Sequence, residues 1–93
     1  MRRKVGRLDD GDSGRFTDGT RFRLDNVRAP EKHQYGGSTA TRTLAGMLGR
    51  SGGNVNVGVV GRDAYGRQVV RMSNQDGSIN ERMRRSGYKN KGW

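Results

Sequence analysis

The chain has 93 residues, which allows one domain with a modest core, and its 29% hydrophobic content and 16 glycines predict short strands and tight turns. Its formal net charge of +10, carried mostly by arginine, favours a polyanionic partner, although a solubilising surface, an acidic protein or a membrane surface would also suit it. The absence of cysteine excludes disulfides, thiolate metal sites and a cysteine nucleophile, and no apolar run approaches the roughly 20 residues of a membrane helix.

The N-terminal third predicts two short strands and two turns. Residues 4–8 are typical of a strand, and the following Asp9-Asp10-Gly11-Asp12-Ser13-Gly14 is turn chemistry with three carboxylates. Residues 15–17 can extend briefly before Asp18-Gly19, the strongest short hairpin signal in the chain. We therefore expect an acidic turn close to a hairpin.

A third strand is predicted over residues 20–27, where the side chains alternate. Phe22 and Leu24 fall on one face, and the other face carries Arg21, Arg23 and Asp25. Pro30 ends this segment because proline lacks the donor that a sheet ladder needs. The pattern indicates a half-buried strand that displays arginines outward.

The remainder predicts a helix, two strands and a second helix. Ser38 or Thr39 is expected to cap a helix that reaches about Arg50. Residues 54–59 and 67–73 are typical of strands, separated by a loop. Residues 78–86 predict a short helix, because Ser78 is followed three residues later by Glu81 in a capping-box pattern.

Five short strands with a helix after the third form the layout of an OB-fold barrel. The expected fold class is therefore α+β and mainly β, with a helix between strands 3 and 4 and a short C-terminal helix; other small α+β folds share this order. We expect one domain over residues 1–93, with a core of about 4–88 and a loose basic tail over 89–93.

Three separated segments together resemble the staphylococcal nuclease, or thermonuclease, family. They are Asp10-Gly11-Asp12-Ser13, then Arg21-Phe22-Arg23-Leu24-Asp25-Asn26-Val27-Arg28-Ala29-Pro30-Glu31, then Asp63-Ala64-Tyr65-Gly66-Arg67. Residues 79–88 are also similar to the family's helix that ends in a glycine. The resemblance covers about residues 4–88 in the right order, and it implies an OB-fold nuclease.

The resemblance implies that Arg23 and Arg67 clamp one phosphate and that Glu31 orients or deprotonates the attacking water. This chemistry suits phosphodiester cleavage, which requires a poised water and stabilisation of charge on the phosphoryl oxygens. Two guanidinium groups can each bind one phosphate bidentately. The family precedent is 5′ P–O cleavage that leaves 3′-phosphate ends.

The resemblance also implies a divalent-cation site. Asp12 would be the direct ligand, Asp10 a supporting acidic residue, and the backbone carbonyl of Ala29 a further donor. The cation would be calcium, with magnesium as the other candidate, because both are hard ions that bind oxygen. Arg28 stands where the family has its second carboxylate ligand, so we expect a weak site or an altered metal dependence.

Nucleic-acid contacts are expected at Tyr65, Arg28 and Asp63, with Tyr65 beside a bound nucleotide as a hydroxyl donor or a stacking face. Taken singly, each site residue has a simpler interpretation. The aspartates could only shape turns, Arg23 could be a solvated strand residue, Glu31 could pair with Lys32, and Tyr65 could cap the core.

The leading hypothesis is a nuclease of low sequence specificity that acts on DNA, RNA or both. The alternative is a catalytically weakened or inactive OB module that only binds nucleic acid, which Arg28 favours and Glu31 disfavours. A protein-interaction barrel would not require so much arginine. We expect a monomer without membrane attachment, cytoplasmic by default because no signal peptide is seen, or secreted if a leader has been removed.

Overall fold

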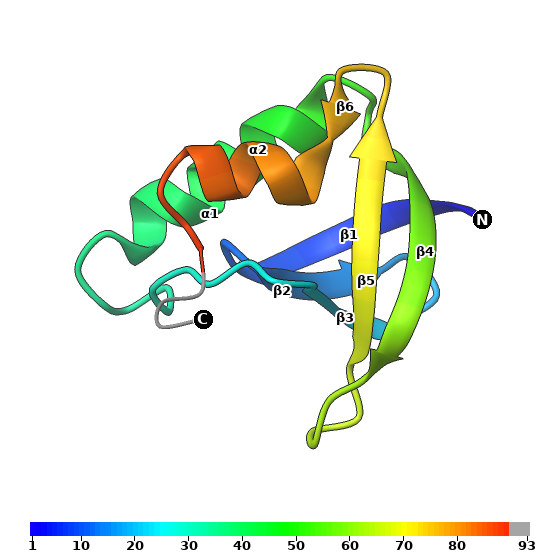
Figure 1. Ribbon diagram of the computed structural model, residues 1–93, viewed down its shortest axis with the longest axis horizontal. Helices are drawn as coiled ribbons and strands as arrows, with labels where there is room; N and C mark the ends of the chain where they lie inside the picture. Colours follow the sequence, from blue (N-terminus) through cyan, green and yellow to red (C-terminus); the bar gives the residue numbers. More distant parts are fainter. Residues whose placement is uncertain (90–93) are drawn as a thin grey trace.

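The computed structural model describes residues 1–89. Its elements follow the chain in the order β1 (Arg2–Asp10), β2 (Ser13–Phe16), β3 (Arg21–Leu24), α1 (Gly37–Gly49), β4 (Asn54–Arg62), β5 (Gln68–Asn74), β6 (Gly77–Ser78) and α2 (Ile79–Arg85), as Figure 1 shows. Within the described residues, no helix is both long enough and apolar enough to cross a membrane.

The strands form one sheet that closes on itself. Its order is β3-β2-β1-β4-β5-β6, and each of these neighbours pairs antiparallel. A parallel pairing of β3 with β5 closes the ring, with Phe22 opposite Gln68 and Leu24 opposite Val70. The predicted OB-fold is confirmed, with α1 between β3 and β4 and α2 near the C-terminus. The short β6 was not predicted, and it forms because Gly77, at φ 106°, completes a hairpin with β5.

The core lies between the inner face of the ring and the two helices, which lie on the same side of the sheet in Figure 1. Phe22 and Leu24 are fully buried, as the alternation over β3 predicts. The rings of Phe16 and Phe22 lie 4.8 Å apart between centroids. The helices contribute buried apolar side chains from one face each, namely Ala40, Leu44, Leu48, Ile79 and Met83.

The two helices begin in different ways. The predicted cap at Ser38 or Thr39 is wrong: α1 begins at Gly37, and its N-cap is Gly36 at φ 80°, with no side-chain cap. A glycine occupies this position because a left-handed backbone suits a residue without Cβ. The cap predicted for α2 is confirmed, since the Ser78 hydroxyl accepts the N–H of Glu81 at 3.1 Å.

Strand ends differ modestly from expectation. β3 ends at Leu24 instead of continuing to residue 27, because Asn26 adopts a left-handed φ of 56°. β4 continues to Arg62 because Gly61 and Arg62 still pair with β5. The outward arginines of β3 therefore end directly before a bend, and this bend leads the chain into the loop that follows.

The C-terminal end of the described chain is fastened to that loop. Tyr88 packs partly buried against the core, and its carbonyl accepts the N–H of Arg28 at 3.1 Å. Lys89, expected in the loose tail, instead forms an antiparallel bridge with Val27. The rest of the predicted tail, 90–93, lies outside the described residues.

A buried amide also joins α2 to the sheet. Asn80, 2% exposed, accepts the N–H of Met72 at 2.8 Å. It donates to the carbonyls of Asp25 and Val70, both at 3.0 Å. One side chain thereby fixes the position of α2 against β5 and the segment after β3.

Candidate active site

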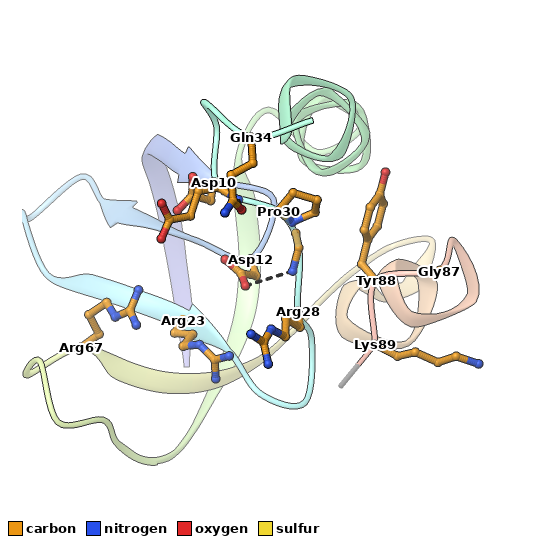
Figure 2. A pocket seen from close by; sticks show the side chains of 12 residues that line it. Asp10, Asp12, Arg23, Arg28, Pro30, Gln34, Arg67, Gly87, Tyr88 and Lys89 are labelled. Carbon is orange, nitrogen blue, oxygen red and sulfur yellow. Dashed lines mark hydrogen bonds between the residues drawn. The ribbon is translucent and has the colours of Figure 1, made fainter. Parts of the chain in front are cut away.

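An open cavity of about 830 Å³ lies where the acidic turn, β3 and the loop after β3 meet, and Figure 2 shows the side chains around it. It brings together the three residues predicted to act on phosphate and water, Arg23, Glu31 and Arg67. The other lining residues are Asp10, Asp12, Arg28, Ala29, Pro30, Gln34, Gly87, Tyr88 and Lys89. Side chains from distant parts of the sequence therefore share one cavity.

The acidic turn is packed closely enough to require glycine. A Cβ on Gly11 would lie 2.7 Å from the Cβ of Ala40 and 3.0 Å from the Cβ of Ala29. Glycine therefore allows the turn to approach both α1 and the loop after β3. Asp12 follows it, 9% exposed, and its Oδ2 accepts the N–H of Ala29 at 3.2 Å, drawn as the dashed line in Figure 2.

Arg23 and Arg67 both lie close enough to the carboxylate of Asp12 to favour its charged form. Burial raises the pKa of Asp12 above its ordinary value. The N–H of Ala29 and the positive charges of Arg23 and Arg67 oppose that rise, whereas Asp10 adds to it. In Figure 2 the side chains of Arg67, Arg23 and Arg28 lie on the same side of Asp12.

Asp10 connects the acidic turn to the loop that carries Glu31. Its Oδ1 accepts the N–H of Lys32 at 2.7 Å, and the hydroxyl of Ser13 lies 3.5 Å from its Oδ2. Asp10 and Asp12 therefore hold the loop at Lys32 and at Ala29, on the two sides of Glu31. These bonds extend from the acidic turn to a different segment, so the two aspartates position the loop after β3 at the cavity.

Arg67 is held by the loop in which it lies. Its Nε donates to Oδ2 of Asp63 at 2.6 Å, and Oδ1 of Asp63 accepts the N–H groups of Tyr65 and Arg67, each at 2.9 Å. Desolvation raises the pKa of Asp63, but the hydrogen bonds from Arg67 and Tyr65 outweigh it, so the pKa lies below its ordinary value. Within residues 1–89 the terminal nitrogens of Arg67 make no hydrogen bond, which leaves them free to bind an anion.

Tyr65 and Asp63, predicted to contact nucleic acid, do not line the cavity. Tyr65 is 73% exposed, so it does not cap the core. Its ring centroid lies 5.6 Å from the guanidinium carbon of Arg67, a cation–π distance. Asp63 contacts Arg67 and the loop backbone, which fits a positioning role, while a nucleotide contact at Tyr65 stays a prediction.

Glu31 lies on the exposed rim, with its side chain 62% exposed. Its Oε2 lies 3.3 Å from Nε2 of His33, and its N–H donates to the side chain of Gln34 at 2.8 Å. Its carbonyl approaches α1 closely, because a Cβ on Gly37 would lie only 1.9 Å from that oxygen. The backbone at Glu31 is therefore fixed, while its carboxylate faces solvent beside the cavity.

Comparison with known proteins agrees with this geometry. Residues 21–91 match the staphylococcal nuclease homologue family. The chain belongs to this family. The match includes Arg23, Glu31 and Arg67, and it begins after the acidic turn with Asp10 and Asp12. A search of curated proteins gives no match to the chain.

The metal implied by the nuclease family fits these residues poorly. Within residues 1–89 no three His, Asp or Glu side chains gather into a metal-binding group. One oxygen of Asp10 and one of Asp12 already accept backbone N–H groups, and Arg28 lines the same cavity. Calcium favours six to eight oxygen ligands, usually with several carboxylates. Two engaged aspartates and the backbone of Ala29 provide few donors.

Sequence reasoning missed four residues that shape this nuclease-family site. Gln34 and Gly37 hold the backbone of Glu31, and the only signal for them was a polar, glycine-rich loop. Tyr88 and Lys89 line the cavity because the segment after α2 returns to Val27 and Arg28. No local pattern in the sequence shows this long-range pairing.

Proposed function

We propose that this protein hydrolyses phosphodiester bonds of DNA, RNA or both, with little sequence specificity. The observation that carries the proposal is that Arg23, Arg67 and Glu31, from three segments, line one cavity. Membership of the staphylococcal nuclease homologue family supports a nuclease-type activity. Binding through the arginines of the cavity would depend on phosphate contacts and would therefore fall steeply with salt.

In this proposal the two arginines bind the scissile phosphate. Asp63 holds Nε of Arg67 and so directs its terminal nitrogens, while Arg23 approaches from the neighbouring strand. Two guanidinium forks can each form paired hydrogen bonds to phosphoryl oxygens. Because these charges are already positioned, they stabilise the negative charge that develops in the transition state.

Glu31 would orient or deprotonate the attacking water. Its carboxylate is exposed on the rim and would reach a water on the side of the phosphate opposite the leaving oxygen. His33, 3.3 Å away, could receive or share that proton. Following the family precedent, the water attacks phosphorus, the 5′ P–O bond breaks, and the phosphate stays on the 3′ end.

We also propose that divalent-cation assistance is weak, because the donor set is small. Asp12 would be the main calcium or magnesium ligand, with Asp10 and Ala29 as secondary donors. Arg28 adds a third positive charge to the cavity and would supply part of the electrostatic stabilisation that a cation gives. Calorimetric titration with calcium tests this: weak binding that Arg28→Asp strengthens is expected, and tight binding that Arg28→Asp does not improve contradicts it.

A binding module without catalysis is the second candidate. Arg28 in the cavity and the lack of a three-acid metal group within residues 1–89 favour it. Such a module would still use the arginines to bind phosphate, but it would have no need of Glu31. The two candidates therefore differ in what Glu31 does.

Cleavage assays with glutamate variants distinguish the candidates. A plasmid and a single-stranded oligonucleotide are incubated with the protein in calcium, in magnesium and in chelator. Glu31→Gln is compared with Glu81→Gln, a matched control, because Glu81 is exposed on α2 and pairs with Arg85 away from the cavity. Fragments that Glu31→Gln abolishes and Glu81→Gln preserves support the nuclease, and end-group analysis should find 3′-phosphates. A shifted but intact substrate supports the binding module.

A further inference from the structure

Three arginines form a continuous row across the outer face of the sheet. Arg7 of β1 lies opposite Arg15 of β2, and Arg15 lies opposite Arg21 of β3. Residues directly opposite in antiparallel strands point to the same face, with Cβ atoms roughly 4.5–5.5 Å apart. All three side chains are exposed, and the row spans roughly 10 Å across the strands.

The row depends on an irregularity in β1. Val5 pairs with Phe16 and Arg7 with Arg15, so two steps along β1 correspond to one step along β2. Without this bulge at Gly6, strict alternation would give Arg7 the same inward direction as Val5. Bulges re-aim side chains and often lie beside active sites.

The next row on the same face of the sheet borders the candidate active site, and its middle residue, Ser13, is buried. There Asp10 of β1 lies opposite Ser13 of β2, and Ser13 lies opposite Arg23 of β3. Arg21 and Arg23 are two residues apart on β3, so the two rows are separated by roughly 7 Å. The arginine row therefore lies next to Arg23, one of the two arginines proposed to bind the scissile phosphate.

The positive charge of the arginine row is only partly balanced by nearby groups. Arg7 has Asp9 at 3.6 Å, and Arg21 donates to the carbonyl of Tyr65. Arg15, between them, makes no ion pair or hydrogen bond through its side chain within residues 1–89. Like charges directly opposite each other destabilise a sheet, so this arrangement costs stability unless an anion binds there.

We propose that Arg7, Arg15 and Arg21 bind the phosphates of the nucleic-acid strand that continues from the scissile linkage. This proposal rests on the function proposed above and extends it, since it assigns the protein a substrate of several nucleotides and a direction across β3, β2 and β1. Arg21 also contacts the loop of the exposed Tyr65, which offers a stacking face beside the row. An arginine-lined path with an aromatic neighbour is the arrangement that binds single strands without sequence preference.

Oligonucleotide length and salt provide the test. Arg7→Gln, Arg15→Gln and Arg21→Gln are made in the Glu31→Gln background, so that the substrate survives, and compared with Arg50→Gln. Arg50 is a suitable control because it is similarly exposed but pairs with Asp76 and lies on none of the strands β1, β2 and β3 that carry the row. Binding is measured for single strands of about four and about sixteen nucleotides, the range of OB-fold sites.

Each row variant should weaken binding of the longer strand about two- to fivefold, the range for an exposed charge contact, and leave the shorter strand unchanged. The slope of log affinity against log salt should fall by roughly 0.7 for each arginine removed. Arg15→Gln should not lower the melting temperature, because it relieves like-charge repulsion.

Three results would contradict the proposal that the row binds nucleic-acid phosphates. They are unchanged salt slopes, an equal loss of affinity with Arg50→Gln, and arginine-dependent binding only to phosphatidylserine vesicles. Failure of the nuclease proposal is separate: it would show as intact substrate with Glu31 present, whatever these binding data give.

Discussion

Replacing Gly37 with alanine should disturb the candidate site through backbone contact alone. The added Cβ would lie 1.9 Å from the carbonyl oxygen of Glu31 and 2.7 Å from its carbonyl carbon. Real Cβ atoms essentially never approach other heavy atoms within 3.0 Å, so Glu31 or the start of α1 must move by about 1 Å. Overpacking of this kind typically costs about 1–3 kcal/mol of folding free energy.

The same displacement should reduce catalysis. A misplacement of about 1 Å at a catalytic group can lower the rate about 100-fold. We therefore expect Gly37→Ala to lose about 1–3 kcal/mol in urea unfolding and to lower cleavage up to about 100-fold while the protein remains folded by circular dichroism.

Two glycines in the same helix provide the matched control. A Cβ on Gly46 or Gly49 would meet no atom within 4 Å. Alanine there should stabilise α1 by up to about 1 kcal/mol and leave cleavage unchanged. If Gly37→Ala loses neither stability nor cleavage rate, as expected for these controls, the close contact between α1 and Glu31 is not what fixes the loop.

Three further predictions concern single polar side chains. Asn80→Ala should lower the free energy of unfolding by about 1–3 kcal/mol in urea, because the N–H of Met72 loses its partner; a change near zero would contradict this. The folded-state pKa of Asp12 is raised, so the contribution of Asp12 to the free energy of unfolding falls as pH rises above 3.8. The melting temperature of Asp12→Asn should therefore be higher than that of the parent protein at pH 7, but not at pH 3. Asp63 has a lowered pKa, so its contribution is present above pH 3.8 and is lost as pH falls below it. Asp63→Asn keeps an acceptor for the backbone N–H groups but loses the hydrogen bond to Nε of Arg67. This variant should slow cleavage roughly tenfold, and unaltered kinetics would contradict the role of Asp63 in positioning Arg67.

Local patterns in the sequence were sufficient for much of the fold. The alternation around Phe22 predicted the buried face of β3, although not its C-terminal end, and the Ser78–Glu81 spacing predicted the start of α2, because both features depend on neighbours in the chain. The cap of α1 could not be found this way. Gly36 is the N-cap of that helix through its left-handed backbone, whereas Ser38 and Thr39, although good cap residues, lie inside the helix.

The family motif predicted the lining of the cavity only in part, because Tyr65 and Asp63, which it also names, do not line it, and contacts between distant segments could not be predicted. Arg23, Glu31 and Arg67 were expected together and do line one cavity. The bridge between Val27 and Lys89 joins segments that no local signal relates. The arginine row could not be predicted from the sequence either, because its register depends on a bulge in β1.

The most direct test of the central claim is a crystal structure of the Glu31→Gln variant with a short single-stranded oligonucleotide. The account predicts one phosphate bound to the guanidinium groups of both Arg23 and Arg67, with residue 31 facing it across a water. A phosphate held elsewhere on the surface, or one that contacts neither arginine, would contradict it.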